Sequence, residues 1–193
     1  IITGTQLPIA QQSLRNEIHK DTHQAHVVWG NRNYPITDPK RTGMYLLNNI
    51  LGGPGMNSRL NVALREKYGL VYSVESNVTS YTDSGLFTIY FGTDPQQTER
   101  CLSLTAKELK KLRENLLTPL QLHAARKQLF GQMLISSENK ENSTLSMGKS
   151  MLHLGRYDSM EEVVRNVERF SAFDLRDIAN EIMDPDAMSL LIY

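Results

Sequence analysis

Two alternating stretches joined by a short turn constrain the fold of this chain more than any other feature. Polar and apolar side chains alternate over residues 70–79 and again over 86–92. The segment between them, Thr82-Asp83-Ser84-Gly85, is typical of a hairpin connection. The pattern predicts two antiparallel strands that turn one face to a core, with Tyr72 and Val74 together on one face of the first strand.

Three of the expected helix starts are marked by a capping side chain followed by proline. The capping oxygen accepts from a free N–H of the first turn, and proline loses nothing there because its own N–H would be unpaired. The pattern occurs at Asp38-Pro39, Asp94-Pro95 and Thr118-Pro119, while Ser159 and Ser171 begin capping boxes. We expect helices from residue 39, over 57–68, from residue 95, and over 119–137, 141–154, 159–169 and 171–183.

The expected elements follow the order strand, helix, strand, strand, several helices, strand. Residues 24–30 supply the first of these strands and 187–193 the last, while residues 31–35 are expected to form a loop. A short additional strand is expected within 15–19. This βαββαβ plan predicts an α+β two-layer sandwich, with a mixed, largely antiparallel sheet and helices on one face.

Length and composition narrow the class of protein. The 193 residues suffice for one core, and we expect residues 1–13 to be a linker or lead-in and 14–193 a single domain. Lys plus Arg and Asp plus Glu both number 21, which argues against a nucleic-acid partner. No apolar run reaches the ~20 residues of a membrane helix, so no membrane partner is expected.

The first residue and the cysteine count bear on the cellular compartment of the protein. The chain begins with Ile1 rather than methionine, which indicates a fragment or a processed product. Cys101 is its single cysteine, which favours a reducing compartment and predicts a cytoplasmic protein. A periplasmic location stays open, because a signal upstream of Ile1 would not be visible.

Three candidate sites are weakened by their sequence context. Residues 52–55 (GGPG) precede a helix as a phosphate loop does, but a helix comes before them and no Lys-Ser/Thr pair follows. His19, His23 and His26 lack a zinc-type arrangement with a carboxylate, and in a strand the last two point to opposite faces. Cys101 lies in an apolar helical stripe, which favours a core cysteine over a nucleophile.

Arg65 and Tyr72 form the strongest candidate site. Arg65 lies off the apolar stripe of its expected helix, and Tyr72 follows across a turn at Gly69, so the two side chains can converge on one ligand. A guanidinium supplies a forked cationic donor and a phenol supplies an O–H, which suits a carbonyl or carboxylate. From the residues alone, a solvated Arg65 and a core Tyr72 remain open alternatives.

The stretch that contains this pair resembles a known family signature. GGPGMNSRLNVALREKYGLVYSV is similar to the C-terminal, non-catalytic half of zinc metallopeptidases of the pitrilysin and mitochondrial processing peptidase (insulinase-like) type. The matching positions are Ser58-Arg59-Leu60, Arg65-Glu66-Lys67, Gly69-Leu70 and Tyr72. His23 to His26 resembles the opening strand of that half, and Thr118 to Leu122 resembles one of its helix starts.

The resemblance implies a half-domain that encloses a chamber with a homologous N-terminal half. That half would carry zinc on an HxxEH motif. An Arg and a Tyr of the C-terminal half would contact the substrate, and the matching residues in this chain are Arg65 and Tyr72. This chain has no HxxEH, so we expect it to contain no catalytic residue and no metal ligand. Zinc is expected in the full-length protein or a partner half.

The partners expected from the resemblance are a peptide or unfolded protein as substrate, and an N-terminal catalytic half or partner subunit, with a dimer possible. An alternative is a non-peptidase structural or protein-interaction domain of the same fold. Nucleic-acid binding on a ferredoxin-like sheet is disfavoured by the neutral charge.

Overall fold

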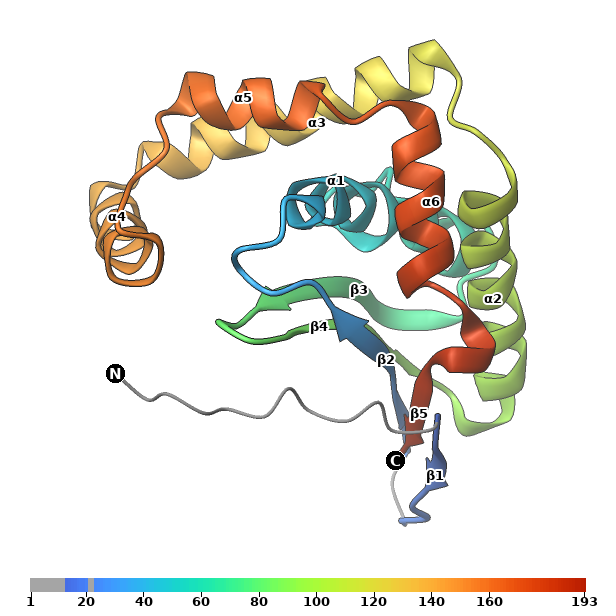
Figure 1. Cartoon of the computed structure of the whole chain (residues 1–193). Helices are drawn as coiled ribbons and strands as arrows, with labels where there is room; N and C mark the ends of the chain where they lie inside the picture. The colour runs from blue at the N-terminus through green and yellow to red at the C-terminus, as the bar shows by residue number, and fades with distance from the viewer. Residues whose placement is uncertain (1–12, 21–22) are drawn as a thin grey trace.

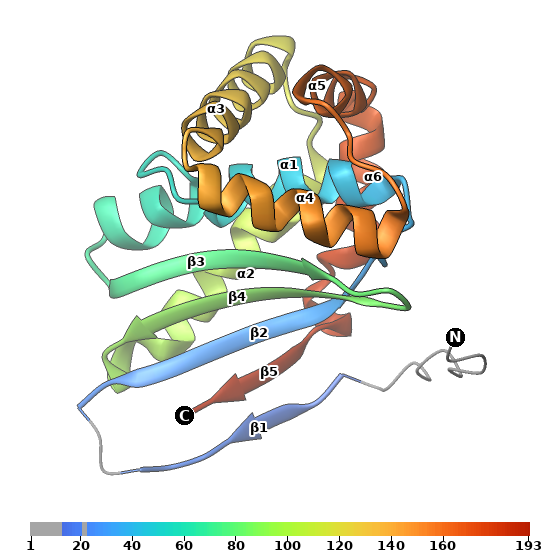
Figure 2. The same cartoon turned by 90° about the vertical axis from the view of Figure 1, so that its left-hand side faces the viewer.

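The computed structural model describes residues 13–20 and 23–193, which form a sheet covered by helices (Figures 1 and 2). The expected linker over 1–13 falls almost wholly outside the described residues. The strands are β1 (Arg15–Glu17), β2 (Ala25–Asn33), β3 (Val71–Ser80), β4 (Gly85–Thr93) and β5 (Ser189–Ile192). The helices are α1 (Lys40–Gly52), α2 (Thr98–Glu114), α3 (Pro119–Ser137), α4 (Lys140–Leu154), α5 (Met160–Glu168) and α6 (Ala172–Ile182). Shorter turns are η1 (Asn61–Glu66), η2 (Pro95–Gln97) and η3 (Pro185–Ala187).

The five strands lie in the order β1-β5-β2-β4-β3. β1 pairs with β5 in parallel, and every other pair is antiparallel. The α+β class and the mixed, largely antiparallel sheet are therefore as the element order predicts, and β1 lies inside the expected short strand. β3 forms one edge of the sheet, which leaves one side of its backbone without a strand partner in the described part of the chain.

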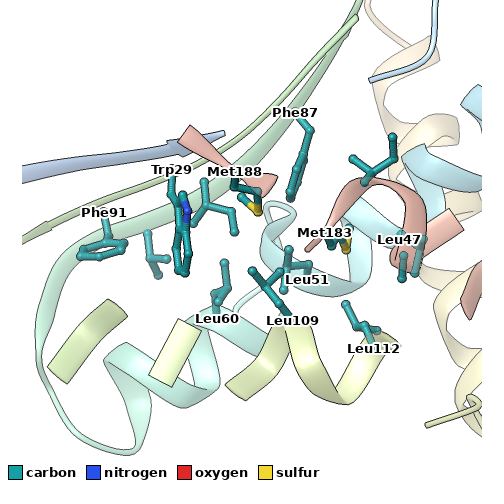
Figure 3. Close-up of a cluster of buried hydrophobic side chains, with 14 of the residues drawn as sticks. Trp29, Leu47, Leu51, Leu60, Phe87, Phe91, Leu109, Leu112, Met183 and Met188 are labelled. Atoms are coloured by element: carbon teal, nitrogen blue, oxygen red, sulfur yellow. The ribbon is translucent and has the colours of Figure 1, made fainter. Parts of the chain in front are cut away.

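The core lies between one face of the sheet and helices α1, α2 and α6. Phe87, Ile89 and Phe91 of β4 are fully buried, while the residues between them are more exposed. Figure 3 shows the side chains that gather there: Trp29, Leu47, Leu51, Leu60, Phe87, Phe91, Leu109, Leu112, Met183 and Met188. Cys101 is also fully buried, which confirms the core assignment, and burial raises the pKa of its thiol.

The helix starts follow the capping signals in the sequence. Thr118, Ser159 and Ser171 each accept from a backbone N–H three residues later, and that later residue returns a side-chain bond. The observed α3 has the expected bounds, and α4, α5 and α6 differ from expectation by at most one residue at either end. Within the described ranges, none of these helices combines the length and the apolar character needed to cross a bilayer.

Two local expectations are wrong. The loop expected over 31–35 is strand as far as Asn33, because β2 stays paired with β4 along its whole length, up to Asn33 opposite Gly85. The helix expected over 57–68 extends only over 59–66, and over Asn61–Glu66 it is a π-helix. Lys67 N–H donates to Val62 C=O at 3.0 Å, a wider turn that apolar periodicity does not distinguish from an α-helix.

Candidate functional site

Arg65 is presented to solvent by the short helix η1. Leu60 and Leu64 on this segment are fully buried and fix its orientation on the core. Arg65 follows Leu64 directly and is exposed. Its position off the apolar stripe is therefore as predicted, and the packing of the two leucines determines which way η1 turns it.

The connection between Arg65 and β3 is held by backbone bonds. Gly69 adopts φ 60°, a left-handed conformation that glycine takes without a steric penalty. Its N–H donates to Arg65 C=O at 2.8 Å, and Leu70 N–H donates to Leu64 C=O at 2.9 Å. The fully buried Thr93 of β4 donates its hydroxyl to Leu70 C=O at 2.5 Å. This segment is thus a fixed link rather than a loose loop.

Tyr72 lies on a β-bulge at the start of β3. Val71 is opposite Thr93 and Ser73 is opposite Gly92, so Tyr72 is an extra residue without a partner across the pair. The bulge shifts the alternation by one position, and the Tyr72 side chain is 63% exposed. The expectation that Tyr72 shares the buried face of Val74 is therefore wrong, and so is the core alternative for this tyrosine.

Both side chains are available to a ligand. Among the described residues, neither the Arg65 guanidinium nor the Tyr72 hydroxyl has a hydrogen-bond or ion-pair partner. They lie at the two ends of the η1–β3 connection, beside the open edge of the sheet. Together they offer a cationic fork and a neutral O–H donor, the donor set that suits a peptide carbonyl or a carboxylate.

A basic cleft lies on another side of η1, between this segment and α2. Its volume is about 430 Å³, and its charged lining consists of Arg59, Lys67, Lys107, Lys111 and Glu108. Glu108 already accepts from Lys111 at 2.6 Å. Burial lowers the pKa of the Arg59 guanidinium, and the Glu108 carboxylate opposes that effect. The cleft is therefore locally positive in a chain whose formal net charge is zero, a concentration of charge that composition does not reveal.

The histidines considered from the sequence do not come together. His26 Nδ1 lies 2.9 Å from the Tyr90 hydroxyl, and the two rings stack. His19 Nε2 lies 3.8 Å from a carboxylate oxygen of Glu17. Over residues 13–20 and 23–193, no three His, Cys, Asp or Glu side chains are grouped as metal ligands would be.

The glycines before η1 serve packing. A Cβ on Gly52 would lie 2.7 Å from the backbone nitrogen of Ser76, so α1 can approach β3 this closely only with glycine there. A helix precedes residues 52–55, as the sequence predicts. The role of Gly52 in packing α1 against β3 accounts for this glycine without a phosphate ligand.

Comparison with known proteins assigns the family. A family model described as the peptidase M16 inactive domain matches residues 4–129. The chain belongs to the M16 peptidase family. Among curated relatives of this M16 inactive domain, the zinc protease YmxG of Bacillus subtilis is 31% identical over 173 residues, 90% of this chain and 42% of the relative. A zinc protease of Streptomyces coelicolor is 35% identical over 166 residues, 86% of this chain and 36% of the relative.

Solved structures show the same fold. The M16 inactive domain from Pseudomonas fluorescens superposes with a TM-score of 0.86 at 23% identity, over 97% of this chain and 45% of that one. A chain of complex III2 from Candida albicans superposes with a TM-score of 0.79 at 14% identity, over 93% of this chain and 45% of that one. The present M16 domain covers 42% and 36% of the two curated relatives named above, about two fifths of their length.

Proposed function

We propose that this M16 inactive domain holds peptide substrates for a zinc-bearing half that lies outside the chain. The observation that carries the proposal is that Arg65 and Tyr72 are exposed and have no partner among the described residues, at the two ends of one fixed connection. Unpaired side chains on a fixed backbone are suited to bind an added ligand, because binding then orders the side chains but not the backbone that carries them.

The metal belongs to the other half in this account. The relatives are named zinc proteases, and the chain covers only 42% and 36% of the first two. The described residues of this chain do not fit zinc, because no three of its His, Cys, Asp or Glu side chains are grouped. Bound to the other half, zinc would activate the water that cleaves the peptide.

The residues of this chain would orient the substrate. The Arg65 guanidinium would donate to the oxygen of a peptide carbonyl, and its positive charge would stabilise negative charge that develops there during cleavage. The Tyr72 hydroxyl would donate to a neighbouring oxygen, and two contacts would fix the peptide better than one. An extended peptide or an unfolded segment would fit best, since both donors lie beside the open edge strand β3.

Substitution of Arg65 tests the proposal in the active, zinc-loaded enzyme. Arg65→Ala should lower kcat/KM about 10²–10³-fold, the usual effect of removing one donor to developing charge. The unfolding temperature should not change, because Arg65 is exposed.

Lys110→Ala is the control, since it removes the same charge from an exposed side chain of α2 that lies outside both the Arg65–Tyr72 site and the basic cleft. It should leave kcat/KM within a few-fold of the parent value. An Arg65→Ala enzyme with unchanged kcat/KM would contradict substrate positioning and favour a structural or protein-interaction role for this domain.

A further inference from the structure

Helix α4 contains no buried residue, a property that it shares with its neighbour α3. All fifteen residues of Lys140–Leu154 are described, and none of them is buried. Figure 1 shows α4 at one end of the helical layer, next to α3 and apart from the sheet. Isolated helices of this length are marginal in water, and packing of an apolar face normally stabilises them. The contacts within the described chain do not provide that packing.

The side of α4 that faces the body of the domain is largely polar. The side facing the body carries Asn142, Ser143, Ser146, Ser150 and Leu154, which line a cleft of about 330 Å³ together with residues of α1, α3 and α5. A surface helix normally turns its apolar residues to the core and its polar residues to solvent. In α4 three serines face inward beside Leu154, whereas Leu145 and Leu152 are exposed.

The opposite side of the helix, which we call the α4 outer face, consists of Glu141 at its start and then Thr144, Leu145, Gly148, Met151 and Leu152. Leu145 is 58% exposed, Met151 53% and Leu152 86%. Single exposed apolar residues need no explanation, but a row of them at helical spacing on one face indicates an interaction surface.

Gly148 marks the centre of this face. A Cβ at Gly148 would meet no atom within 4 Å among the described residues, so no contact of this chain requires glycine there. Glycine is the least favourable residue inside a helix after proline. Between Leu145 and Leu152 it leaves a shallow notch, where the backbone of a partner can approach closely.

We propose that the α4 outer face is the docking surface for the zinc-bearing half of the protein. The inference rests on the proposed function, because it takes the occupant to be that half. The chain covers 42% of one relative and 36% of another, so more than half of a family member's length remains to be placed against this domain. A permanent partner suits an apolar surface, since obligate interfaces resemble a core cut in half.

Cysteine labelling in the active, full-length protein tests the surface. Leu152→Cys should react with a maleimide at least 10-fold more slowly than Lys110→Cys, a control on the exposed side of α2. Cys101 is fully buried and contributes no background from this domain. The parent protein corrects for cysteines in the other half. Equal labelling rates at the two positions would overturn the proposal.

The choice of occupant is tested by protein concentration. Protection of the cysteine introduced at position 152 should be the same at low and high concentration. Protection that appears only as a dimer forms in sedimentation would assign the face to a second copy and overturn the proposed occupant.

Gly148→Leu, added to the Leu152→Cys variant, should increase the labelling rate, because leucine fills the notch and still favours a helix. An unchanged labelling rate would contradict a close approach of the partner at Gly148.

The two proposals fail separately. Protection at position 152 with an Arg65→Ala enzyme of normal activity would remove only the substrate role. Free labelling at position 152 with an impaired Arg65→Ala enzyme would remove only the docking surface.

Discussion

Arg65 and Tyr72 are joined by a backbone that limits how far they can move relative to one another. Gly69 and Leu70 both bond back to η1, and Thr93 holds Leu70 from β4. If the two side chains bind the same stretch of peptide, loss of either one should loosen the contact made by the other. Their energetic effects should therefore depend on one another.

A double-mutant cycle measures this dependence at the residue scale. Arg65→Ala and Tyr72→Phe should each lower kcat/KM, and the double variant should lose less than the product of the two single effects. Groups that act together are typically non-additive by ~0.5–3 kcal/mol. Steady-state kinetics on one peptide give the coupling. Strict additivity would show that the two residues act on separate parts of the substrate.

The exposure of Arg65 can be predicted from the sequence, but the direction of Tyr72 cannot. Strict alternation along β3 places Tyr72 with Val74 on the buried face. The bulge between Val71 and Ser73 breaks the alternation and turns Tyr72 outward. A bulge depends on how two strands pair, here Val71 with Thr93 and Ser73 with Gly92, and alternation within a single strand does not reveal that register.

At the scale of elements, the turn between η1 and β3 is set by Gly69. Gly69→Ala should destabilise the domain by about 1–2 kcal/mol, because an L-residue is strained at positive φ. Gly148→Ala should have the opposite sign and stabilise by up to ~1 kcal/mol, because Gly148 lies inside a helix with open space around it. Denaturant unfolding of both variants checks the two signs, and a stable Gly69→Ala domain would contradict a strained turn.

A second element-scale contact ties α6 to α1 and to the end of β2. Glu181 accepts from Lys40 Nζ and from the Tyr34 hydroxyl, each at 2.5 Å. The bond from Lys40 and then the bond from Tyr34 lower the pKa of Glu181, while the bond to Glu181 raises the pKa of Lys40. Burial and the bond to Glu181 raise the pKa of Tyr34.

The pH dependence follows from these directions. A lowered Glu181 pKa contributes stability that is complete above the unfolded pKa of glutamate and is lost as acid protonates the folded carboxylate. The gain at neutral pH should be ~1 kcal/mol at most, since Lys40 and Glu181 are nearly half exposed. Glu181→Gln should be less stable at pH 7 and should match the parent at low pH. A difference that persists in acid would exclude ionisation of Glu181 as the cause.

The start of a helix can be predicted from the sequence where capping residues at that start determine it. Thr118-Pro119 fixes the start of α3 through a capping box, and that start agrees with the structure. The π-helical form of η1 and the extension of β2 to Asn33 depend on packing and on pairing with distant residues. Local sequence signals therefore fail at these two places, and η1 is one of the two elements that carry the candidate site.

At the scale of the whole molecule, the domain is one part of a larger protein in this account. The curated relatives are more than twice as long as the matched segment and are named zinc proteases. The apolar face of α4 and the unpaired donors at Arg65 and Tyr72 both lack partners within the described chain. A second half would cover the α4 outer face. It would also hold a peptide near its zinc, where Arg65 and Tyr72 could bind that peptide.

The most direct measurement compares zinc content and peptide cleavage for this domain alone, for the zinc-bearing half alone and for the two together. We predict stoichiometric zinc only where the zinc-bearing half is present, and cleavage at least ~100-fold faster when both are present than with that half alone. One zinc bound by this domain alone and lost on substitution of His19, His23 and His26, or full activity of the zinc-bearing half without this domain, would contradict this prediction.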